Sequence, residues 1–282
     1  RQMKTLVVGA AIALVMAAQC RAEGEKKRYS ITDGEVTLDT IDEGKGPLIV
    51  LLPSSARDSE DYDRLAQDLA SSGFRVNRPQ PRGAGGSKGP TAALTLHDLA
   101  DDVALSIEKS GGGRAVVVGH AFGNWVARMT AVDHPQLVRG VVIAAAASKN
   151  YPKDLLVSLR QAGDPTLPDE TRVKALQTAF FAPGNDPSSW LKGWHPDIAA
   201  YQRPIIADPK EDEWWSGGSA PMLDLQALQD PFRPRSTADD LRKQFGVRVT
   251  IAIIDNASHA LIPEQPQAVA AEIARWAKTL KP

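Results

Sequence analysis

The sequence contains almost no cysteine, and neither positive nor negative charge is in excess. The 282 residues contain one cysteine, Cys20, which leaves no pair for an internal disulfide, so packing alone must hold the fold together. The 43% hydrophobic content is enough for a substantial core, and we expect one large domain. Because 33 basic side chains face 34 acidic ones without a basic cluster, the chain lacks the positive field that selects nucleic acid. We therefore expect no nucleic-acid partner.

Metal-binding and nucleotide-binding patterns are also scarce. The five histidines are scattered at positions 97, 120, 134, 195 and 259, with no HExxH or CxxC spacing, so we expect no metal site. The glycine-rich stretch "PQPRGAGGSKG" looks like a phosphate-binding loop. In a dinucleotide fold, however, a helix opens directly on those glycines, whereas here Pro90 intervenes before a helix near Thr95. The sequence predicts no cofactor.

No hydrophobic run is long enough to cross a membrane. The longest, Thr5 to Ala18, is shorter than the roughly 20 residues that a spanning helix needs, which argues against a permanent anchor. Lys4 precedes this run, and the polar stretch "QCRAEGEKK" follows it. This arrangement is typical of a secretory signal peptide over residues 1–22, with cleavage after Ala22. We expect an exported protein, periplasmic or secreted, and expect the leader to be helical and packed on an apolar surface.

What is present is a regular alternation of strands and helices. Asp33-Gly34 predicts a hairpin turn, and continuous apolar runs predict buried strands at 47–53, 74–79, 114–120, 137–148 and 247–254. Helical patterns lie between them at 59–73, 95–113 and 236–246, and a last helix carries an apolar stripe that runs to Leu280. This order predicts an α/β fold with a mostly parallel sheet and helices on both faces.

The alternation breaks between residues 149 and 220. This stretch has no buried strand, several prolines and four of the six tryptophans. A long insertion without strands between two sheet strands is usually functional, so we interpret residues 149–220 as a helical lid. The core then consists of residues 23–148 and 221–282.

The stretch "VVVGHAFGNWVAR" (116–128) reads as a strand, a sharp turn and the start of a helix, with Gly119, Ala121 and Gly123 in its turn. With the order of elements around it, the chain resembles the α/β-hydrolase superfamily over nearly all of residues 27–282. The resemblance implies an eight-stranded, mostly parallel sheet with a small helical lid. In that fold a nucleophile occupies a strained elbow between such glycines. Here the position holds Ala121, whose methyl group cannot attack a substrate.

The same resemblance implies the other site residues. "LQALQDPFRP" is similar to the family's acid turn, so Asp230 inherits the acid role, and "DNASHALIPEQP" is similar to its histidine loop, so His259 inherits the base role. The backbone amides of Ser55 and Phe122 are the implied oxyanion donors. Ser54 stands where the family usually has a glycine, so its hydroxyl either joins the substrate site or obstructs it. Singly, Asp230 is also an ordinary turn residue and His259 an ordinary loop histidine.

Aromatic residues give the only indication of the substrate. Tryptophans lining an apolar pocket would suit a small apolar ester or lactone, whereas packing inside the lid is the alternative explanation. The sequence leaves homo-oligomerisation open. The tryptophans that we predict to contact substrate are Trp125, Trp190, Trp194, Trp214 and Trp215.

Three interpretations of Ala121 remain open. In the first, alanine replaces a serine by laboratory substitution, which leaves an inactive ester or lactone hydrolase that still binds substrate. In the second, alanine is native and the protein binds an apolar ligand without catalysis. In the third, alanine is native and Asp230 with His259 acts as a general base on water or on a substrate carbon.

Overall fold

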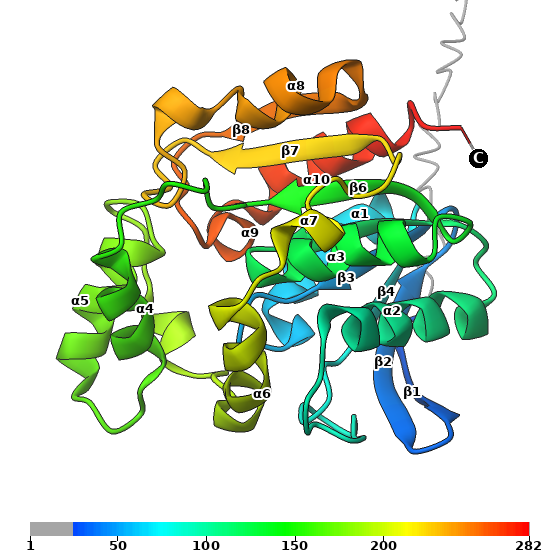
Figure 1. Cartoon of the computed structure of the whole chain (residues 1–282), viewed down its shortest axis with the longest axis horizontal. Helices are drawn as coiled ribbons and strands as arrows, with labels where there is room; N and C mark the ends of the chain where they lie inside the picture. The colour runs from blue at the N-terminus through cyan, green and yellow to red at the C-terminus, as the bar shows by residue number, and fades with distance from the viewer. Residues whose placement is uncertain (1–24, 282) are drawn as a thin grey trace, which may run out of the picture.

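The computed structural model describes residues 25–281 and contains one eight-stranded sheet (Figure 1). The order across the sheet is β1-β2-β4-β3-β5-β6-β7-β8. The signal peptide predicted over residues 1–22 lies outside the described residues, so export and the packing of the leader stay predictions. The strands are β1 (Lys27–Asp33), β2 (Val36–Gly44), β3 (Leu48–Leu52), β4 (Arg75–Pro79), β5 (Ala115–His120), β6 (Val138–Ala144), β7 (Met222–Ala227) and β8 (Val249–Ile254).

The sheet is mostly parallel. β1 and β2 form an antiparallel hairpin that joins β4 antiparallel, and the strands from β4 through β3 to β8 pair in parallel. The central strands are buried because helices cover both of their faces. The predicted fold class, an α/β-hydrolase fold with a mostly parallel eight-stranded sheet, is confirmed.

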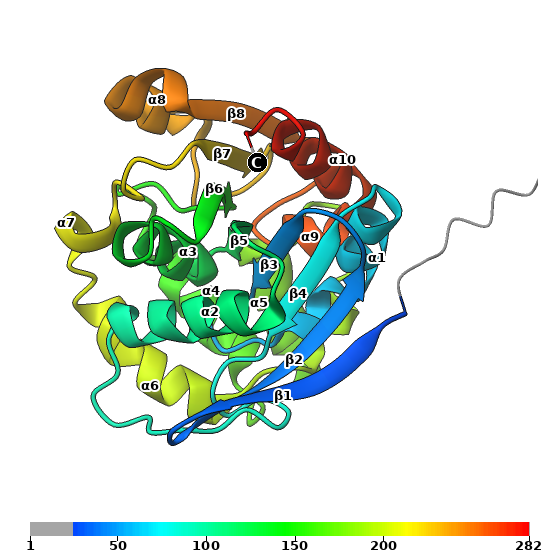
Figure 2. The ribbon, with the colours of Figure 1, turned by 90° about the vertical axis from the view of Figure 1, so that its right-hand side faces the viewer.

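The helices divide between the two faces of the sheet. Figure 2 shows α2 (Leu96–Ser110) and α3 (Phe122–Asp133) on one side, with α1 (Asp63–Ser71) and α10 (Pro266–Ala277) on the other. Each face has its own apolar cluster between helices and strands. The remaining α-helices are α4 (Leu155–Gly163), α5 (Asp169–Ala179), α6 (Pro196–Ala207), α7 (Glu211–Trp214), α8 (Asp240–Phe245) and α9 (Leu261–Glu264); η1 (Ser59–Tyr62), η2 (Ser188–Leu191), η3 (Arg235–Thr237) and η4 (Gly246–Arg248) are 3₁₀ turns.

Four helices differ from the sequence prediction at their ends. The helix expected over 95–113 is α2, which ends at Ser110 before the left-handed Gly111. The helix expected over 59–73 consists of η1 followed by α1, since Asp58 caps η1 by accepting a bond from the amide of Glu60 (2.8 Å). The helix expected over 236–246 is shorter, with α8 beginning only after the separate turn η3. The last helix, α10, ends at Ala277, so Leu280 packs against the apolar cluster from beyond the helix. In each case the apolar pattern predicted the helix but did not predict where the helix begins or ends.

Residues 149–220 contain helices and no strand. Figure 1 shows α4 and α5 beyond the arrowheads of β6 and β7, that is, beyond the carboxyl ends of these strands. Open parallel sheets bind ligands at this edge, where the loops after β3, β5, β7 and β8 also meet. Within the described residues, no helix is both long and apolar enough to cross a membrane.

Candidate functional site

The turn between β5 and α3 is a strained elbow. Ala121 has φ 48° and ψ −115°, a left-handed backbone that costs a residue with a side chain about 1–3 kcal/mol. A Cβ on Gly119 would overlap the backbone of Gly123, and a Cβ on Gly123 would lie 2.6 Å from the carbonyl oxygen of Pro53. Only glycine fits at these two positions, which explains the spacing seen in the sequence. The elbow holds Ala121 between β5 and the amino end of α3.

The structure brings Asp230 and His259 together. Nδ1 of His259 lies 3.0 Å from Oδ2 of Asp230, and both side chains are buried. The other carboxylate oxygen, Oδ1, accepts a bond from the amide of Phe232 (2.9 Å), which fixes the orientation of the carboxylate. Because the carboxylate engages Nδ1, the proton of a neutral imidazole stays there, and Nε2 is left as an acceptor. Nε2 has no partner among the residues that the structure describes.

A buried chain of hydrogen bonds links this histidine to the elbow. Nε2 of His120 donates to the carbonyl oxygen of His259 (2.6 Å), and Nδ1 accepts from the hydroxyl of Tyr62 (3.1 Å). The same hydroxyl accepts from the amide of Ser54 (3.1 Å). Burial lowers the pKa of His120 to about 3, so this ring is neutral. The chain positions three loops relative to one another, those after β3, β5 and β8.

Two backbone amides near Ala121 remain free for a ligand. The amides of Ser55 and Phe122 have no hydrogen-bond partner within residues 25–281. Phe122 begins α3, and the first amides of a helix have no partner inside the helix. Neighbouring groups bond to α6: Oε1 of Gln202 accepts from the hydroxyl of Ser55 (2.9 Å) and from the amide of Ala56 (2.8 Å). Free amides beside Ala121 suit the oxyanion role that the sequence implied.

The tryptophans pack against other side chains. Trp190 and Trp214 are 1% exposed. Trp125 stacks on Trp214 with 4.8 Å between ring centroids, and Trp194 meets Trp190 edge-on with 5.8 Å between centroids. Trp215 lines a different cavity, of about 280 Å³, together with Arg233 and Leu241. The substrate contacts predicted for these residues stay a prediction.

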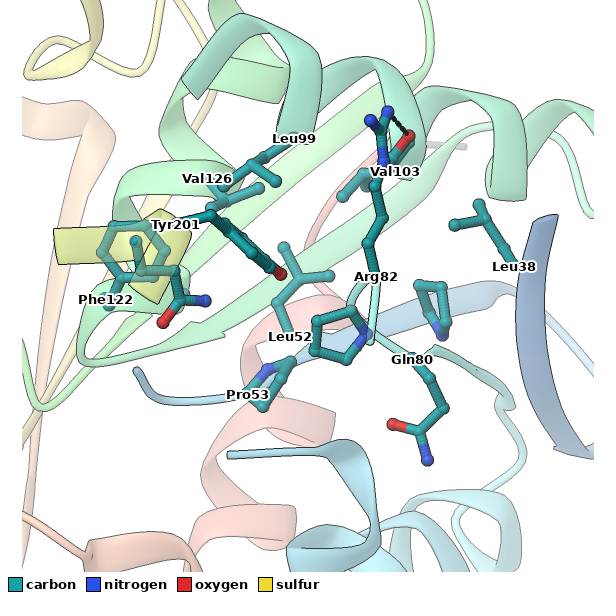
Figure 3. A pocket seen from close by; sticks show the side chains of 15 residues that line it. Leu38, Leu52, Pro53, Gln80, Arg82, Leu99, Val103, Phe122, Val126 and Tyr201 are labelled. Carbon is teal, nitrogen blue, oxygen red and sulfur yellow. Dashed lines mark hydrogen bonds and ion pairs between the residues drawn. The ribbon is translucent and has the colours of Figure 1, made fainter. Parts of the chain in front are cut away.

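A smaller cavity, of about 60 Å³, lies directly beside Phe122 (Figure 3). Its walls come from the ends of β3 and β4, from α2 and α3, and from α6 of the predicted lid. No tryptophan lines it. The side chain of Ser54 is buried but does not line this cavity either.

No group of three His, Cys, Asp or Glu side chains within residues 25–281 could hold a metal ion.

The sequence prediction missed three residues that shape the site: Tyr62, Tyr201 and Gln202. Gln202 lies 147 positions from Ser55 in the chain, and Tyr62 lies 58 from His120. Pairs so far apart leave no periodicity or motif in a single sequence. Tyr201 and Gln202 lie in α6, within residues 149–220, a stretch in which the sequence drew attention only to tryptophans outside this helix.

Comparison with known proteins gives consistent matches. Residues 49–272 match the model of the Alpha/beta hydrolase family. A 2-(acetamidomethylene)succinate hydrolase of Mesorhizobium japonicum is 33% identical over 109 residues, 39% of this chain and 39% of that protein. Epoxide hydrolase B of Mycobacterium tuberculosis is 29% identical over 176 residues, 62% of this chain and 46% of that protein. The matches thus span less than half the length of these curated relatives.

Solved structures extend the likeness to nearly the whole chain. An esterase from Thermogutta terrifontis superposes with a TM-score of 0.73 at 21% identity, covering 90% of this chain and 98% of that one. The crystal structure of an E-2-(acetamidomethylene)succinate hydrolase gives a TM-score of 0.67 at 20% identity, covering 90% and 100%. At these identities the likeness concerns the fold.

Proposed function

The chain belongs to the alpha/beta hydrolase family, and we propose that its site binds a carboxylic ester or lactone of a small molecule for hydrolysis, with Ala121 standing where the nucleophile is required. The observation that carries this proposal is the left-handed backbone of Ala121, at φ 48° and ψ −115°, next to His120, which bonds to the histidine of the Asp230–His259 pair. Left-handed backbone also occurs elsewhere, as at Ala145, but Ala121 combines it with a glycine-flanked turn from a strand into a helix. Strain at an elbow aims the side chain out of the turn.

The proposed chemistry follows from the groups around Ala121. With a serine hydroxyl in place of the methyl group, Nε2 of His259 would take the proton as the oxygen attacks the carbonyl carbon. Asp230 would hold the imidazole in position and stabilise its charged form. The free amides of Ser55 and Phe122 would donate to the oxyanion, and two such donors suit a carbonyl substrate. With alanine, the site binds the same substrate without forming an acyl-enzyme.

A second candidate is direct attack by water. The intact pair of Asp230 and His259 favours it, because a non-catalytic ligand-binding protein has no use for an oriented base. In this case Nε2 of His259 deprotonates a water that occupies the space left by the missing hydroxyl. The names of the curated relatives, a succinate-derivative hydrolase and epoxide hydrolases, support hydrolysis of a small organic molecule in general.

The Ala121→Ser variant tests the proposal. Hydrolysis of p-nitrophenyl esters should rise by several orders of magnitude, because removing such a nucleophile typically costs on the order of 10⁶ in turnover. A fluorophosphonate reagent should add one adduct per chain, measured by intact mass, to the serine variant alone. Adding His259→Ala should return hydrolysis to background.

Ala145→Ser is the matched control. Ala145 shares the left-handed backbone, with φ 50°, and lies buried directly after β6. A serine there should give neither hydrolysis nor labelling. A folded Ala121→Ser variant that cleaves no ester or lactone would contradict the proposal. If the unaltered chain is active and Ala121→Ser lowers that activity, attack by water is the correct mechanism.

A further inference from the structure

The cavity beside Phe122 is the starting point. It shares Phe122 and Pro53 with the region of the proposed oxyanion donors, so a group bound at the elbow can reach into it. Figure 3 shows Leu52, Leu99, Val103 and Val126 around this space, and these side chains make most of its wall apolar. Tyr201 enters from the α6 side. The cavity is therefore a side chamber of the proposed substrate site.

The two charged residues at this cavity are already paired. Arg82 donates to both carboxylate oxygens of Asp102 (2.9 and 2.8 Å) and to the carbonyl oxygen of Pro90 (2.6 Å). Each nitrogen of its guanidinium thus has an acceptor, and the carboxylate has its counter-charge. The lining offers no free cation to a bound carboxylate, and burying an unpaired anion there would be costly. An ionised group is excluded from this chamber.

Tyr201 is different because its hydroxyl has no partner. The residue is 7% exposed, and its hydroxyl oxygen is buried without a hydrogen bond among the described residues. Figure 3 shows the hydroxyl end of the ring pointing into the chamber, toward Leu52 and Arg82. Burial and the nearby charge of Asp102 raise the pKa of Tyr201, so the group keeps its proton and can donate. Buried hydroxyls normally have partners, so this one indicates a missing acceptor.

We propose that the chamber is an acyl pocket for a short chain that carries one uncharged oxygen, an ether, hydroxyl or keto group, to which Tyr201 donates a hydrogen bond. This deepens, and rests on, the proposed ester or lactone function. At 10–15 Å³ per water-sized group, a cavity of about 60 Å³ holds about four to six such groups. The apolar walls accept the carbon atoms, and the Tyr201 hydroxyl, which is buried without a partner, donates to the oxygen.

The test measures binding to the unaltered chain, in which Ala121 cannot form an acyl-enzyme. Methyl 3-methoxypropanoate and methyl pentanoate have the same number of non-hydrogen atoms and differ by an oxygen in place of one methylene. Their dissociation constants are measured by ligand-observed NMR for the unaltered chain and for Tyr201→Phe. A neutral hydrogen bond predicts that the variant shifts the ratio of the two constants toward the pentanoate by about three- to tenfold. Most of the change should be in the methoxy ester.

Tyr29→Phe is the matched control. Tyr29 lies in β1, and its hydroxyl bonds to Asp42 (3.1 Å) away from the chamber, so its loss should leave the ratio unchanged. The Tyr201→Phe variant should also be at least as heat-stable as the unaltered chain, because no protein partner loses a bond. An unchanged ratio in a folded Tyr201→Phe variant overturns the proposal, and so does failure of both esters to bind. An inactive Ala121→Ser variant contradicts the proposed reaction but not this pocket.

Discussion

His120 is a buried histidine that acts as a structural connector. Both of its ring nitrogens are used inside the protein, by the hydroxyl of Tyr62 and by the carbonyl oxygen of His259. It is fully buried, and taking up a second proton would break the bond that it accepts from Tyr62. Protonation of His120 in acid would therefore disturb the hydrogen bonds that position the His259 loop.

We predict that His120 makes the protein less stable in mild acid. Burial lowers its pKa from 6.5, the ordinary value for histidine, to about 3 in the folded chain. Between about pH 6.5 and pH 3, His120 is protonated in the unfolded chain and neutral in the folded chain. This contribution to stability is therefore complete above about pH 6.5 and is lost as the pH falls toward 3, at up to about 1.4 kcal/mol per pH unit. Urea unfolding at a series of pH values measures the slope.

His120→Gln is the comparison variant, since glutamine does not titrate. The variant should be less stable at neutral pH, because the bonds to Tyr62 and His259 are disturbed. Its free energy of unfolding should nevertheless fall less steeply between about pH 6 and pH 4, by up to about 1.4 kcal/mol per pH unit. Parallel slopes for the two proteins would show that His120 does not carry this dependence.

At the scale of elements, α6 and the loop after β3 are joined closely. Gln202 accepts two bonds from this loop, and the amide of His195 donates to the carbonyl oxygen of Ala56 (2.8 Å). Nε2 of His195 also lies 2.6 Å from the carboxylate of Asp58. Arg57 adds a contact to residues 149–220, because it lies over the rings of Trp190 and Trp194 and bonds to the carbonyl oxygen of Lys192. These contacts hold the loop that carries Ser55.

We predict that Gln202 positions the loop for the proposed reaction. In an Ala121→Ser background, Gln202→Met removes the acceptor of the Ala56 amide and the Ser55 hydroxyl with little change in volume. Complete loss of an oxyanion donor costs about 10²–10³ in kcat, so a displaced donor should cost about 10- to 100-fold. KM should change little. The free energy of unfolding should fall by about 1–3 kcal/mol, because a buried amide loses its partner.

Gln202→Asn should restore part of the rate, because it keeps an amide oxygen as acceptor without adding a charge to the buried site. Steady-state kinetics on one p-nitrophenyl ester separates kcat from KM in the three proteins. If Gln202→Met retains full kcat, or loses activity through KM alone, then α6 does not position the loop.

The elements themselves were largely predictable from the sequence. The strands at the centre of the sheet are nearly continuous apolar runs, such as Leu48–Leu52, and these are read directly because burial on both faces permits little else. The ends of α1, α2 and α8 were less predictable. The helix expected over 95–113 stops at the left-handed Gly111, and capping by Asp58 and the separate turn at Arg235–Thr237 depend on local geometry.

At the scale of the whole molecule, the predicted lid packs in two parts. Ile198, Tyr201 and Ile205 of α6 belong to the same apolar cluster as α2, α3 and one face of the sheet. Leu155 of α4 and Leu176 of α5 belong to a separate, smaller cluster, which meets the core through Phe232 and Ala260. Apolar contact with the main core is the chief source of protection against opening, so the two parts should differ in local stability.

We predict that hydrogen exchange will separate these two parts. In native-state exchange at increasing urea concentration, the protected amides of α6 should open together with the core strands, at the free energy of global unfolding. Those of α4 and α5 should open earlier, at a lower free energy and with a smaller urea dependence. Mass spectrometry of peptides from each helix gives the measurement. A single opening event for all of residues 149–220 would show that the insertion behaves as one unit.

The candidate site was predictable only in part. Asp230 and His259 were identified through the resemblance to a family, and the structure places Nδ1 of His259 3.0 Å from Oδ2 of Asp230. The contacts of Gln202 and the unpartnered hydroxyl of Tyr201 exist only after α6 has docked on loops far away in the chain. Such groups are defined by what surrounds them in space, and no spacing in one sequence records this.

The elbow at Ala121 has an evolutionary consequence. Every alanine codon becomes a serine codon by one base change, from GCN to TCN. Since the left-handed turn and the buried Asp230–His259 pair are already in place, that single substitution supplies the missing hydroxyl without further adaptation. Under the proposed reaction, a lineage that carries this turn can gain or lose the catalytic hydroxyl, in either direction, by one nucleotide change.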